Sequence, residues 1–276
     1  MKSIIVPVDF SNQSEKALKI AAGLAKANKA ELLVLHMLEI SPAIISRGEE
    51  YVPQVQMVHL IKAIEERMAA FLDKPYLSDV HLTPVIKHYK VFSEVNDLAE
   101  KHNADLIVMG SHGTDGLDEI FIGSNTERVI RNSSIPVLVV KGDHPEDYAI
   151  ERFVFACDFR EENITAAQQA KDFANALGAS LKLVYINTPG DGFLSTPEAY
   201  EKINHFLAKA NLGIEVEVFN DYTVERGVIN FAESYGAHLI GIPTHGRKGL
   251  SHFFMGSIGE DVANHSGIPV ITFRIS

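Results

Sequence analysis

Short apolar runs alternate with segments of helical periodicity along the whole of this chain. The first apolar run, Lys2–Val8, predicts a buried strand, and Asn12–Asn28 follows with apolar residues at helical spacing behind a capping residue, Ser11. In a later segment, the apolar stripe from Val58 to Phe71 is expected to face the core. Further strands are predicted at Glu31–Leu38, Val85–Tyr89, Leu106–Met109 and Val137–Val140, and helices at Val55–Leu72, at Ser124–Asn132 and from a capping Ser93 to Lys101.

The second part of the chain repeats this order of elements. Its predicted segments are Phe153–Asp158, Asn163–Leu177, Leu181–Ile186, Pro197–Ala210, Glu215–Phe219, Val224–Tyr235, His238–Ile242, Ser257–His265 and Val270–Phe273. Strictly alternating strands and helices predict the α/β class, with a five-stranded, doubly wound parallel sheet in each half and helices on both of its faces. Ligands of such sheets bind beyond the carboxyl ends of the strands, at the switch point of the strand order.

An internal repeat supports this division into two domains of one fold. Ala104–Val140 aligned with Ala237–Phe273 gives 16 identities over 37 positions without a gap. The starts of the halves, Ile4–Phe10 and Phe153–Phe159, correspond as well. The polar stretch Lys141–Asp147 is the natural linker, so we expect one domain at residues 1–142 and another at residues 148–276.

Composition and charge narrow the classes of partner. A hydrophobic content of 46% and a charged content of 22% are typical of a soluble globular protein. The net charge of −11 argues against binding to nucleic acid or to an anionic membrane. The N-terminus enters a strand without signal-peptide architecture and no run spans a bilayer, so we expect a cytoplasmic protein. The single cysteine, Cys157, is interpreted as a small buried residue.

The candidate chemistry begins with two glycine turns. Gly110-Ser-His-Gly113 follows the apolar run Leu106–Met109, and Gly123-Ser124 opens the next predicted helix. Glycine lets backbone N–H groups come close to a ligand, and a helix N-terminus attracts anions, so together they favour a phosphate site. The alternative is that these are two unrelated turns.

Asp9 lies across the same expected crevice, at the carboxyl end of the first strand. Its carboxylate has the chemistry to accept hydrogen bonds from ribose hydroxyls or from an adenine amino group. The alternative is a helix-capping role just before Ser11, and the recurrence of an aspartate at Asp158 favours the ligand role.

These motifs resemble the universal stress protein family. The residues that carry the resemblance are Ile4-Ile-Val-Pro-Val-Asp-Phe-Ser11, Met109-Gly-Ser-His-Gly113, then nine residues, Gly123-Ser-Asn-Thr126, and Ile135-Pro-Val-Leu-Val-Val140. The glycine spacing is the mark of the family's ATP-binding branch. The resemblance implies two tandem Rossmann-like domains of the adenine nucleotide alpha-hydrolase-like kind.

The resemblance also implies a set of nucleotide-binding residues in the first half. Adenine and ribose would contact Pro7, Val8 and Asp9; Met37 or Leu38 would wall the base; Met109, Gly110 and Gly113 would surround the ribose and α-phosphate; and Gly123, Ser124, Asn125 and Thr126 would hold the β- and γ-phosphates. His112 and its counterpart His245 are interpreted as orienting the glycine loops rather than binding metal.

The second half departs from the motif. Pro243 replaces the first glycine and has no N–H to donate, and Gly259 stands where the first half has Thr126. Arg247 and Lys248 return some attraction for phosphate. We therefore expect a weak or vacant second site, formed by Asp158, His245, Gly246, Gly256 and Ser257.

The expected ligand is ATP, with AMP or ADP as alternatives, and Mg²⁺ is expected only on the phosphates because the sequence has no dedicated metal cage. In the family, the last strands pair antiparallel between subunits. The resemblance therefore implies that Ile135–Val140 and Ile268–Phe273 form that pair within one chain. A homodimer of tandem chains and an unidentified protein partner are also expected.

Two classes of function stay open, with a third beside them. The first is a nucleotide-binding protein of stress response or signalling that changes conformation or partner surface, with at most slow hydrolysis or self-phosphorylation. The second is an enzyme, an ATPase or an adenylate-transferring member of the same fold. No Gly-x-x-x-x-Gly-Lys-[Ser/Thr] motif is present, which argues against P-loop hydrolysis. The third is a scaffold that binds no nucleotide.

Overall fold

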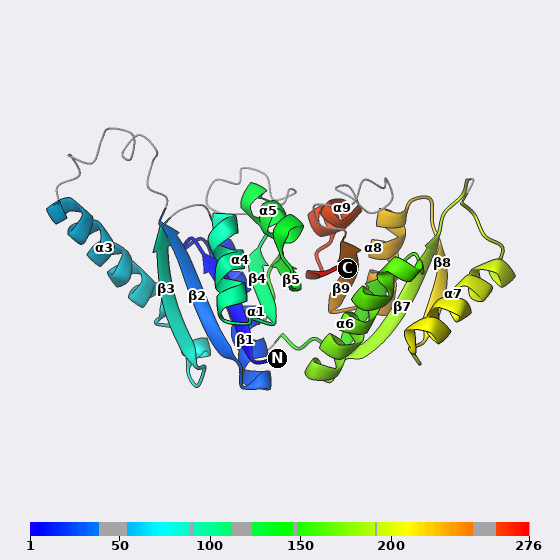
Figure 1. The fold of residues 1–276 in the computed structure, drawn as a ribbon, viewed down its shortest axis with the longest axis horizontal. Coiled ribbons are helices and arrows are strands. Elements are labelled where there is room, and N and C mark those ends of the chain that lie inside the picture. The colour runs from blue at the N-terminus through cyan, green and yellow to red at the C-terminus, as the bar shows by residue number, and fades with distance from the viewer. Residues whose placement is uncertain are drawn as a thin grey trace.

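A computed structural model describes residues 1–38, 54–88, 91–111, 123–145, 148–190, 192–244 and 258–275. In the first half, helices and strands alternate along the chain (Figure 1). The elements are β1 (Ser3–Val8), α1 (Asn12–Asn28), β2 (Glu31–Leu38), α3 (Gln54–Leu72), η1 (Pro75–Leu77), β3 (Leu82–His88), α4 (Val91–Lys101), β4 (Leu106–Gly110), α5 (Ser124–Asn132) and β5 (Val137–Val140).

The second half has the same order of elements. They are β6 (Arg152–Ala156), η2 (Glu161–Asn163), α6 (Ile164–Leu177), β7 (Ser180–Asn187), α7 (Thr196–Ala210), β8 (Val216–Asn220), α8 (Val224–Tyr235), β9 (Leu239–Thr244), α9 (Ile258–His265) and β10 (Val270–Arg274). Ser195 begins α7 with a capping box to Glu198, and Gly178 and Gly236 end α6 and α8 in left-handed conformations.

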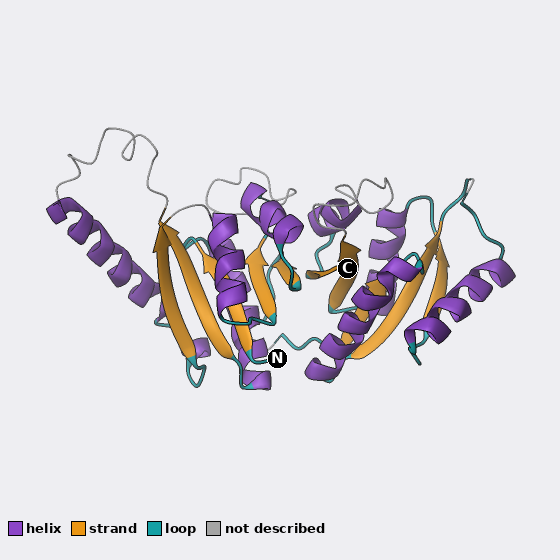
Figure 2. Ribbon diagram, viewed as in Figure 1, coloured by secondary structure: helices purple, strands orange, loops and turns teal. Residues whose placement is uncertain are grey.

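All the strands belong to one sheet, in the order β3-β2-β1-β4-β5-β10-β9-β6-β7-β8 (Figure 2). Every neighbouring pair is parallel except β5 with β10, which is antiparallel and joins Val137, Leu138 and Val139 to Thr272, Ile271 and Val270. The strand order reads the same outward from this junction on both sides, so the halves are related by a pseudo-two-fold axis. The predicted fold and the predicted pairing of the last strands within the chain are both confirmed.

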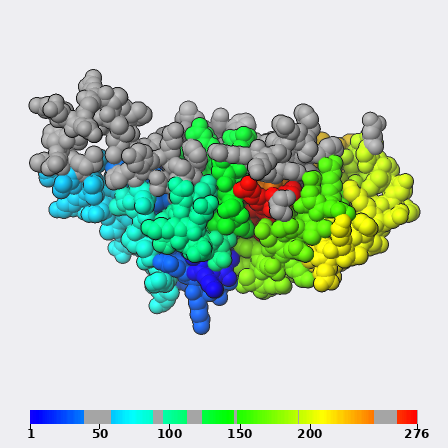
Figure 3. Space-filling view, viewed as in Figure 1, coloured from blue at the N-terminus to red at the C-terminus, as the bar shows by residue number. Residues whose placement is uncertain are grey.

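The core is continuous on one face of the sheet and divided on the other. On the shared face, α1 and α6 contact each other, and one cluster of buried side chains runs from Ile4 through Leu138 and Ile271 to Phe273. On the opposite face, the first half packs α4 and α5 over its own cluster and the second half packs α8 and α9 over another. Figure 3 shows the C-terminal segment in red lying against the green segment that contains α5 and β5, at the centre of the molecule.

Several predicted boundaries were wrong at the margins. β3 begins at Leu82 rather than Val85 and runs through Pro84, which an edge strand tolerates because one side of its backbone needs no partner. α4 begins at Val91, ahead of the expected cap Ser93. β9 continues past Ile242 because residues as far as Thr244 pair with β10.

The apolar stripe of α3 is only partly core. Ile64 and Met68 are buried as expected, but Val58 is 63% exposed. α3 lies over the edge strand β3, and its N-terminal turns extend beyond the sheet (Figure 1). Leu60 in the same turns is also exposed. The helical periodicity identified the helix correctly, whereas the length of its buried face depends on where the sheet ends.

A glycine in β9 makes room for the aromatic cluster beside the junction of the halves. A Cβ atom on Gly241 would lie 2.7 Å from the ring of Phe153 and 2.8 Å from that of Phe155. Both rings also approach Phe273 of β10, with centroids 6.3 and 5.9 Å apart. The backbone of β9 is therefore in direct contact with the rings, and a side chain at this position has no space.

We expect Gly241→Ala to lower the free energy of unfolding by about 1–3 kcal/mol, because overpacking forces the rings and the strand apart. The matched control is Gly23→Ala in α1, where an added Cβ meets nothing within 4 Å. There alanine should raise the free energy of unfolding by about 0.5–1 kcal/mol, because glycine is the poorer helix former. Chemical denaturation measures both, and equal effects of the two substitutions would contradict the packing argument.

Candidate functional site

The acidic residue of the predicted site lies where β1 ends. Asp9 is half-buried, and its Oδ1 accepts a hydrogen bond from the backbone N–H of Ser11 at 3.0 Å. The cap of α1 is Ser11, whose side-chain oxygen accepts from the N–H of Ser14 at 3.2 Å. Asp9 therefore lies two residues before the cap and does not fill that position itself.

The two glycine turns meet at the neighbouring strand end. β4 lies beside β1, so their carboxyl ends share one edge of the sheet. Ser111, just after β4, receives a hydrogen bond on its carbonyl from the N–H of Gly123 at 2.7 Å, and its own N–H donates to Val140 at 3.0 Å. The start of the loop is thereby fixed against the first residues of α5. His112 and Gly113 lie outside the described residues.

The N-terminus of α5 faces this junction with backbone donors that the helix itself does not use. Gly123 is the N-cap, and the N–H groups of the first helical residues, Ser124 and Asn125, have no carbonyl partner within the helix. Such a terminus carries a partial positive charge and favours an anion. The described geometry thus places the N-terminus of α5 beside the start of the glycine loop.

Gly110 and Thr126 also have packing roles that the sequence did not reveal. A Cβ on Gly110 would lie 2.9 Å from the carbonyl oxygen of Gln13, in the first turn of α1. Thr126 is buried and donates its hydroxyl proton to the carbonyl of Gly110 at 3.0 Å. The close approach of Gly110 to Gln13 brings β4 against α1, and the hydrogen bond from Thr126 joins α5 to β4.

The apolar residues of the predicted site lie in or beside the core. Pro7 and Val8 are buried in β1, and Leu38 is half-buried at the end of β2. Met37 and Met109 are both buried in the cluster beneath α4 and α5. Met37 lies near the end of β2 and Met109 near the end of β4, on either side of β1, so they form the floor of this edge of the sheet.

An aromatic and basic cluster lies next to Asp9, and the sequence analysis missed it. Phe10 has a φ of 65°, a left-handed conformation that is unusual for a bulky residue. Its ring lies 4.2 Å from that of His36 and 5.4 Å from that of Phe71, and the guanidinium of Arg67 lies 4.6 Å from its centroid. The strained turn directs Phe10 under α3.

His36 is held in its neutral form within this cluster. Burial lowers its pKa most strongly, and the nearby Arg67 lowers it further, while the hydrogen bond to Val8 and the charge of Asp9 act in the opposite direction. Its Nδ1 donates to the carbonyl of Val8 at 2.8 Å. This bond ties β2 to the last residue of β1, just before Asp9.

The second half repeats the cluster with different side chains. Phe159 again has a positive φ, 56°, and its ring approaches those of Tyr185 at 6.1 Å and Phe206 at 5.2 Å. By strand register, Tyr185 occupies the position in the second half that His36 occupies in the first. Counting from the equivalent phenylalanines Phe71 and Phe206, Lys202 likewise corresponds to Arg67. The ammonium of Lys202 lies 5.1 Å from the centroid of Tyr185.

The aspartate of the second half is engaged by two side chains of its own chain. Asp158 keeps the bond from the following loop, here from the N–H of Arg160 at 3.0 Å. In addition, Nε of Arg160 lies 3.1 Å from its Oδ2, and the amide of Asn163 donates to its Oδ1. The corresponding residues in the first half are Ser11 and Ser14, which are too short to make these contacts.

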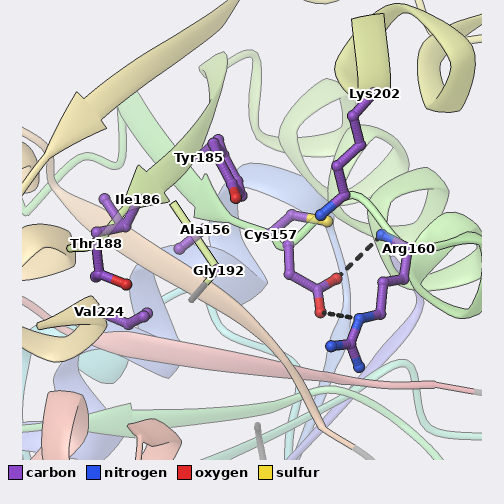
Figure 4. Close-up of a pocket in the computed structure, with 10 residues that line it drawn as sticks. Ala156, Cys157, Arg160, Tyr185, Ile186, Thr188, Gly192, Lys202 and Val224 are labelled. Carbon is purple, nitrogen blue, oxygen red and sulfur yellow. Dashed lines mark hydrogen bonds and ion pairs between the residues drawn. The ribbon is translucent and has the colours of Figure 1, made fainter. Parts of the chain in front are cut away.

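A pocket of about 180 Å³ opens at this site (Figure 4). Its walls come from the ends of β6 and β7, the loop that follows β7, and the helices α7 and α8. They are formed by Ala156, Cys157, Asp158, Arg160, Tyr185, Ile186, Thr188, Gly192, Lys202 and Val224. Figure 4 shows Lys202 extending toward Cys157, with Arg160 on the same side and Ile186, Thr188 and Val224 across from them.

Among these lining residues, the sequence analysis assigned only Asp158 to a binding site. The repeat itself was the available signal, because counting from Phe10 and Phe159 identifies Arg160 as the residue that replaces a serine. Cys157 is buried, as predicted, and burial raises the pKa of its thiol. His245, Gly246, Gly256 and Ser257 lie outside the described residues.

The described part of the chain holds neither a metal-binding cluster nor a helix fit to cross a membrane. No group of three or more histidine, cysteine, aspartate or glutamate side chains there has the arrangement of a metal site. Among the helices in those same ranges, none combines the length and the apolar character needed to cross a membrane.

Comparisons with known proteins agree on one family. The family model described as "Universal stress protein family" matches residues 1–141 and again residues 149–274. A universal stress protein of Mycolicibacterium smegmatis is 26% identical over 98% of this chain and 96% of its own length. The universal stress protein MJ0531 of Methanocaldococcus jannaschii is 33% identical over 51% of this chain and 82% of its own length.

A solved structure extends the likeness to the whole fold. The crystal structure of a universal stress protein from Archaeoglobus fulgidus superposes with a TM-score of 0.74, at 20% identity, over 99% of this chain and 98% of that one. The family model, the full-length relative and the fold all lead to the same result. This chain belongs to the universal stress protein family and carries two of its domains in tandem.

Proposed function

We propose that the chain binds ATP in its first half and acts in stress response or signalling, through a nucleotide-dependent change of conformation or of partner surface. The observation that carries this proposal is the hydrogen bond from Gly123 to the carbonyl of Ser111. It holds the glycine loop against the N-terminus of α5, at the same sheet edge as Asp9. A phosphate chain needs hydrogen-bond donors, which the N-terminus of α5 offers, and a ribose needs an acceptor, which Asp9 offers.

The described residues divide into a sugar end and a phosphate end. Asp9 accepts hydrogen bonds from the ribose, next to Pro7 and Val8, while Met37 and Leu38 border the adenine. The amides of Ser124, Asn125 and Thr126 hold phosphates, and Thr126 contributes its N–H because its hydroxyl proton is donated to Gly110. The same groups serve AMP and ADP, and any Mg²⁺ binds through the phosphates.

Binding rather than catalysis is the proposed activity. Among the described residues at this sheet edge, His36 is the histidine that would be considered as a general base. Its Nδ1 already donates a hydrogen bond to the carbonyl of Val8, so this nitrogen is not available to accept a proton. We propose at most slow hydrolysis, in a cytoplasmic protein that binds another protein or a second copy of itself. Rapid turnover abolished by Asp9→Ala would instead favour the ATPase or adenylate-transfer alternative.

The halves are proposed to differ, with residues 1–142 as the nucleotide domain and residues 148–276 as a domain with a degenerate motif. Asp158 is paired with Arg160 and Asn163, so its oxygens are already satisfied. Pro243 lies within β9, paired with Phe273 of β10, and offers no N–H to a phosphate. One nucleotide per chain follows from this asymmetry.

The proposal is tested first by identifying what the protein carries. Denaturing the purified chain and analysing the released small molecules by mass spectrometry should reveal an adenine nucleotide. Calorimetric titration of the emptied protein with ATP should then give one site per chain. Two equal sites would overturn the asymmetry, and no site at all would favour the nucleotide-free scaffold.

Asp9→Ala is expected to weaken ATP binding by about 10- to 150-fold, because hydrogen bonds from the ribose lose a charged acceptor. The matched control is Asp158→Ala, which removes the same residue type at the equivalent position of the second half. Calorimetry should find its ATP affinity unchanged. Equal losses in the two variants would show that the aspartates act on the fold rather than on the nucleotide.

Gly113→Val is expected to leave the fold intact but to abolish stabilisation by ATP, because a side chain would obstruct the approach of the loop to the phosphates. With ATP at 100 times its dissociation constant, the unsubstituted protein should gain about 2.7 kcal/mol of stability. Thermal unfolding with and without ATP measures this gain. Gly246→Val, at the matched position of the second half, should retain it, and an unchanged gain in Gly113→Val would refute the site.

A further inference from the structure

We infer that the pocket in the second half binds a small molecule with one carboxylate group and an apolar body. This goes beyond the proposed nucleotide site, because it concerns the other half of the chain and a different class of ligand. The juxtaposition that carries it is a lysine pointing into an apolar pocket whose aspartate is already neutralised by the protein itself (Figure 4).

The first step is the state of Asp158. Its side chain is 13% exposed and is held by the guanidinium of Arg160 and the amide of Asn163. A ligand hydroxyl would have to displace one of these donors from a largely buried carboxylate, which costs more than a new hydrogen bond returns. The pocket has therefore lost the hydroxyl-accepting character that Asp9 gives to the first half.

The second step is the charge of Lys202. Its ammonium lies over the ring of Tyr185, and it forms no ion pair with any residue that the structure describes. Burial lowers the pKa of Lys202, and Asp158 offsets this only in part. A half-buried cation in this position gains most from a ligand that brings the missing negative charge.

The third step is the size and lining of the pocket. Its volume of about 180 Å³ lies below the roughly 300–1,000 Å³ of sites for drug-sized ligands. Ala156, Ile186 and Val224 make part of the wall apolar, and Thr188 adds one hydroxyl. A whole nucleotide exceeds this space, whereas a ring or a short branched chain with one acidic group fits it.

The fourth step is the number of charges. Among the lining residues, Lys202 and Arg160 are positive and Asp158 is negative, and Arg160 pairs both with Asp158 and with Glu162, which lies outside the lining. Lys202 is therefore the lining cation that forms no ion pair with a described residue. The chain as a whole carries a net charge of −11, which repels polyanions more strongly than monoanions. A single carboxylate balances the pocket, and a polyphosphate does not.

The experiment compares benzoate with benzamide, its uncharged counterpart of similar shape, on the full-length protein. Saturation-transfer NMR and calorimetric titration should detect benzoate, with benzamide bound about 10- to 150-fold more weakly because it lacks the charge. Phenylacetate and 4-methylpentanoate, titrated alongside, vary the apolar body. No binding by any of the three acids would overturn the inference, as would equal binding of benzoate and benzamide.

The variant that assigns the site is Lys202→Met, which keeps the length of the side chain and removes its charge. This substitution should weaken binding of the acids by about 10- to 150-fold, the same factor that separates benzamide from benzoate. Lys209→Met is the matched control, because Lys209 lies on the same helix but forms an exposed ion pair with Glu161. Equal losses in both variants would overturn the assignment, and thermal unfolding confirms that each is folded.

Titration with ATP separates this inference from the proposed function. Lys202→Met should bind ATP as the unsubstituted protein does, and saturating ATP should leave the benzoate signal in place. Displacement of benzoate by ATP would place both ligands in one site and overturn the inference. Loss of ATP binding in Asp9→Ala, with benzoate binding retained, would show that the two sites are separate.

Discussion

The antiparallel pairing of β5 with β10 is the interaction on which the rest of the structure depends. It turns two sheets into one and closes the inner edge strand of each half, which would otherwise expose a row of unpaired backbone groups. It also merges the cores on one face, where Leu138 and Ile271 belong to the same cluster. The other face keeps a separate core for each half, so the helices that border each crevice pack independently.

A common frame with local differences explains how the halves diverge. In both, a phenylalanine with a positive φ follows the aspartate and packs under a helix, at Phe10 and at Phe159. The difference lies at the next residue, where the first half has Ser11 and the second half has Arg160. The side chain of Ser11 is too short to reach the aspartate, whereas the guanidinium of Arg160 forms an ion pair with it. The backbone is therefore shared, and the chemistry at the sheet edge is set by the neighbours of one carboxylate.

Most of the fold was predictable because apolar periodicity and helix caps are local signals. The bounds of α1, β2, α5 and α8 agree with the prediction. β3 was cut short because Pro84 is acceptable only at an edge, and the exposure of Val58 depends on where the sheet ends. Asp9 and Gly110 lie in contiguous motifs, so the sequence alone could propose them as candidates. The pairing of Arg160 with Asp158 and the position of Lys202 are tertiary contacts, which periodicity does not report.

The covalent linker between β5 and β6, which joins the two halves, has a consequence for how the two sites evolve. When two identical chains pair through their last strands, every substitution appears in both crevices, so neither can change its ligand without the other. Here the linker keeps the second half at a high effective concentration next to the first, so the two last strands pair within one chain. Selection is then free to act on one crevice alone, and a single gene can couple a retained specificity to an acquired one.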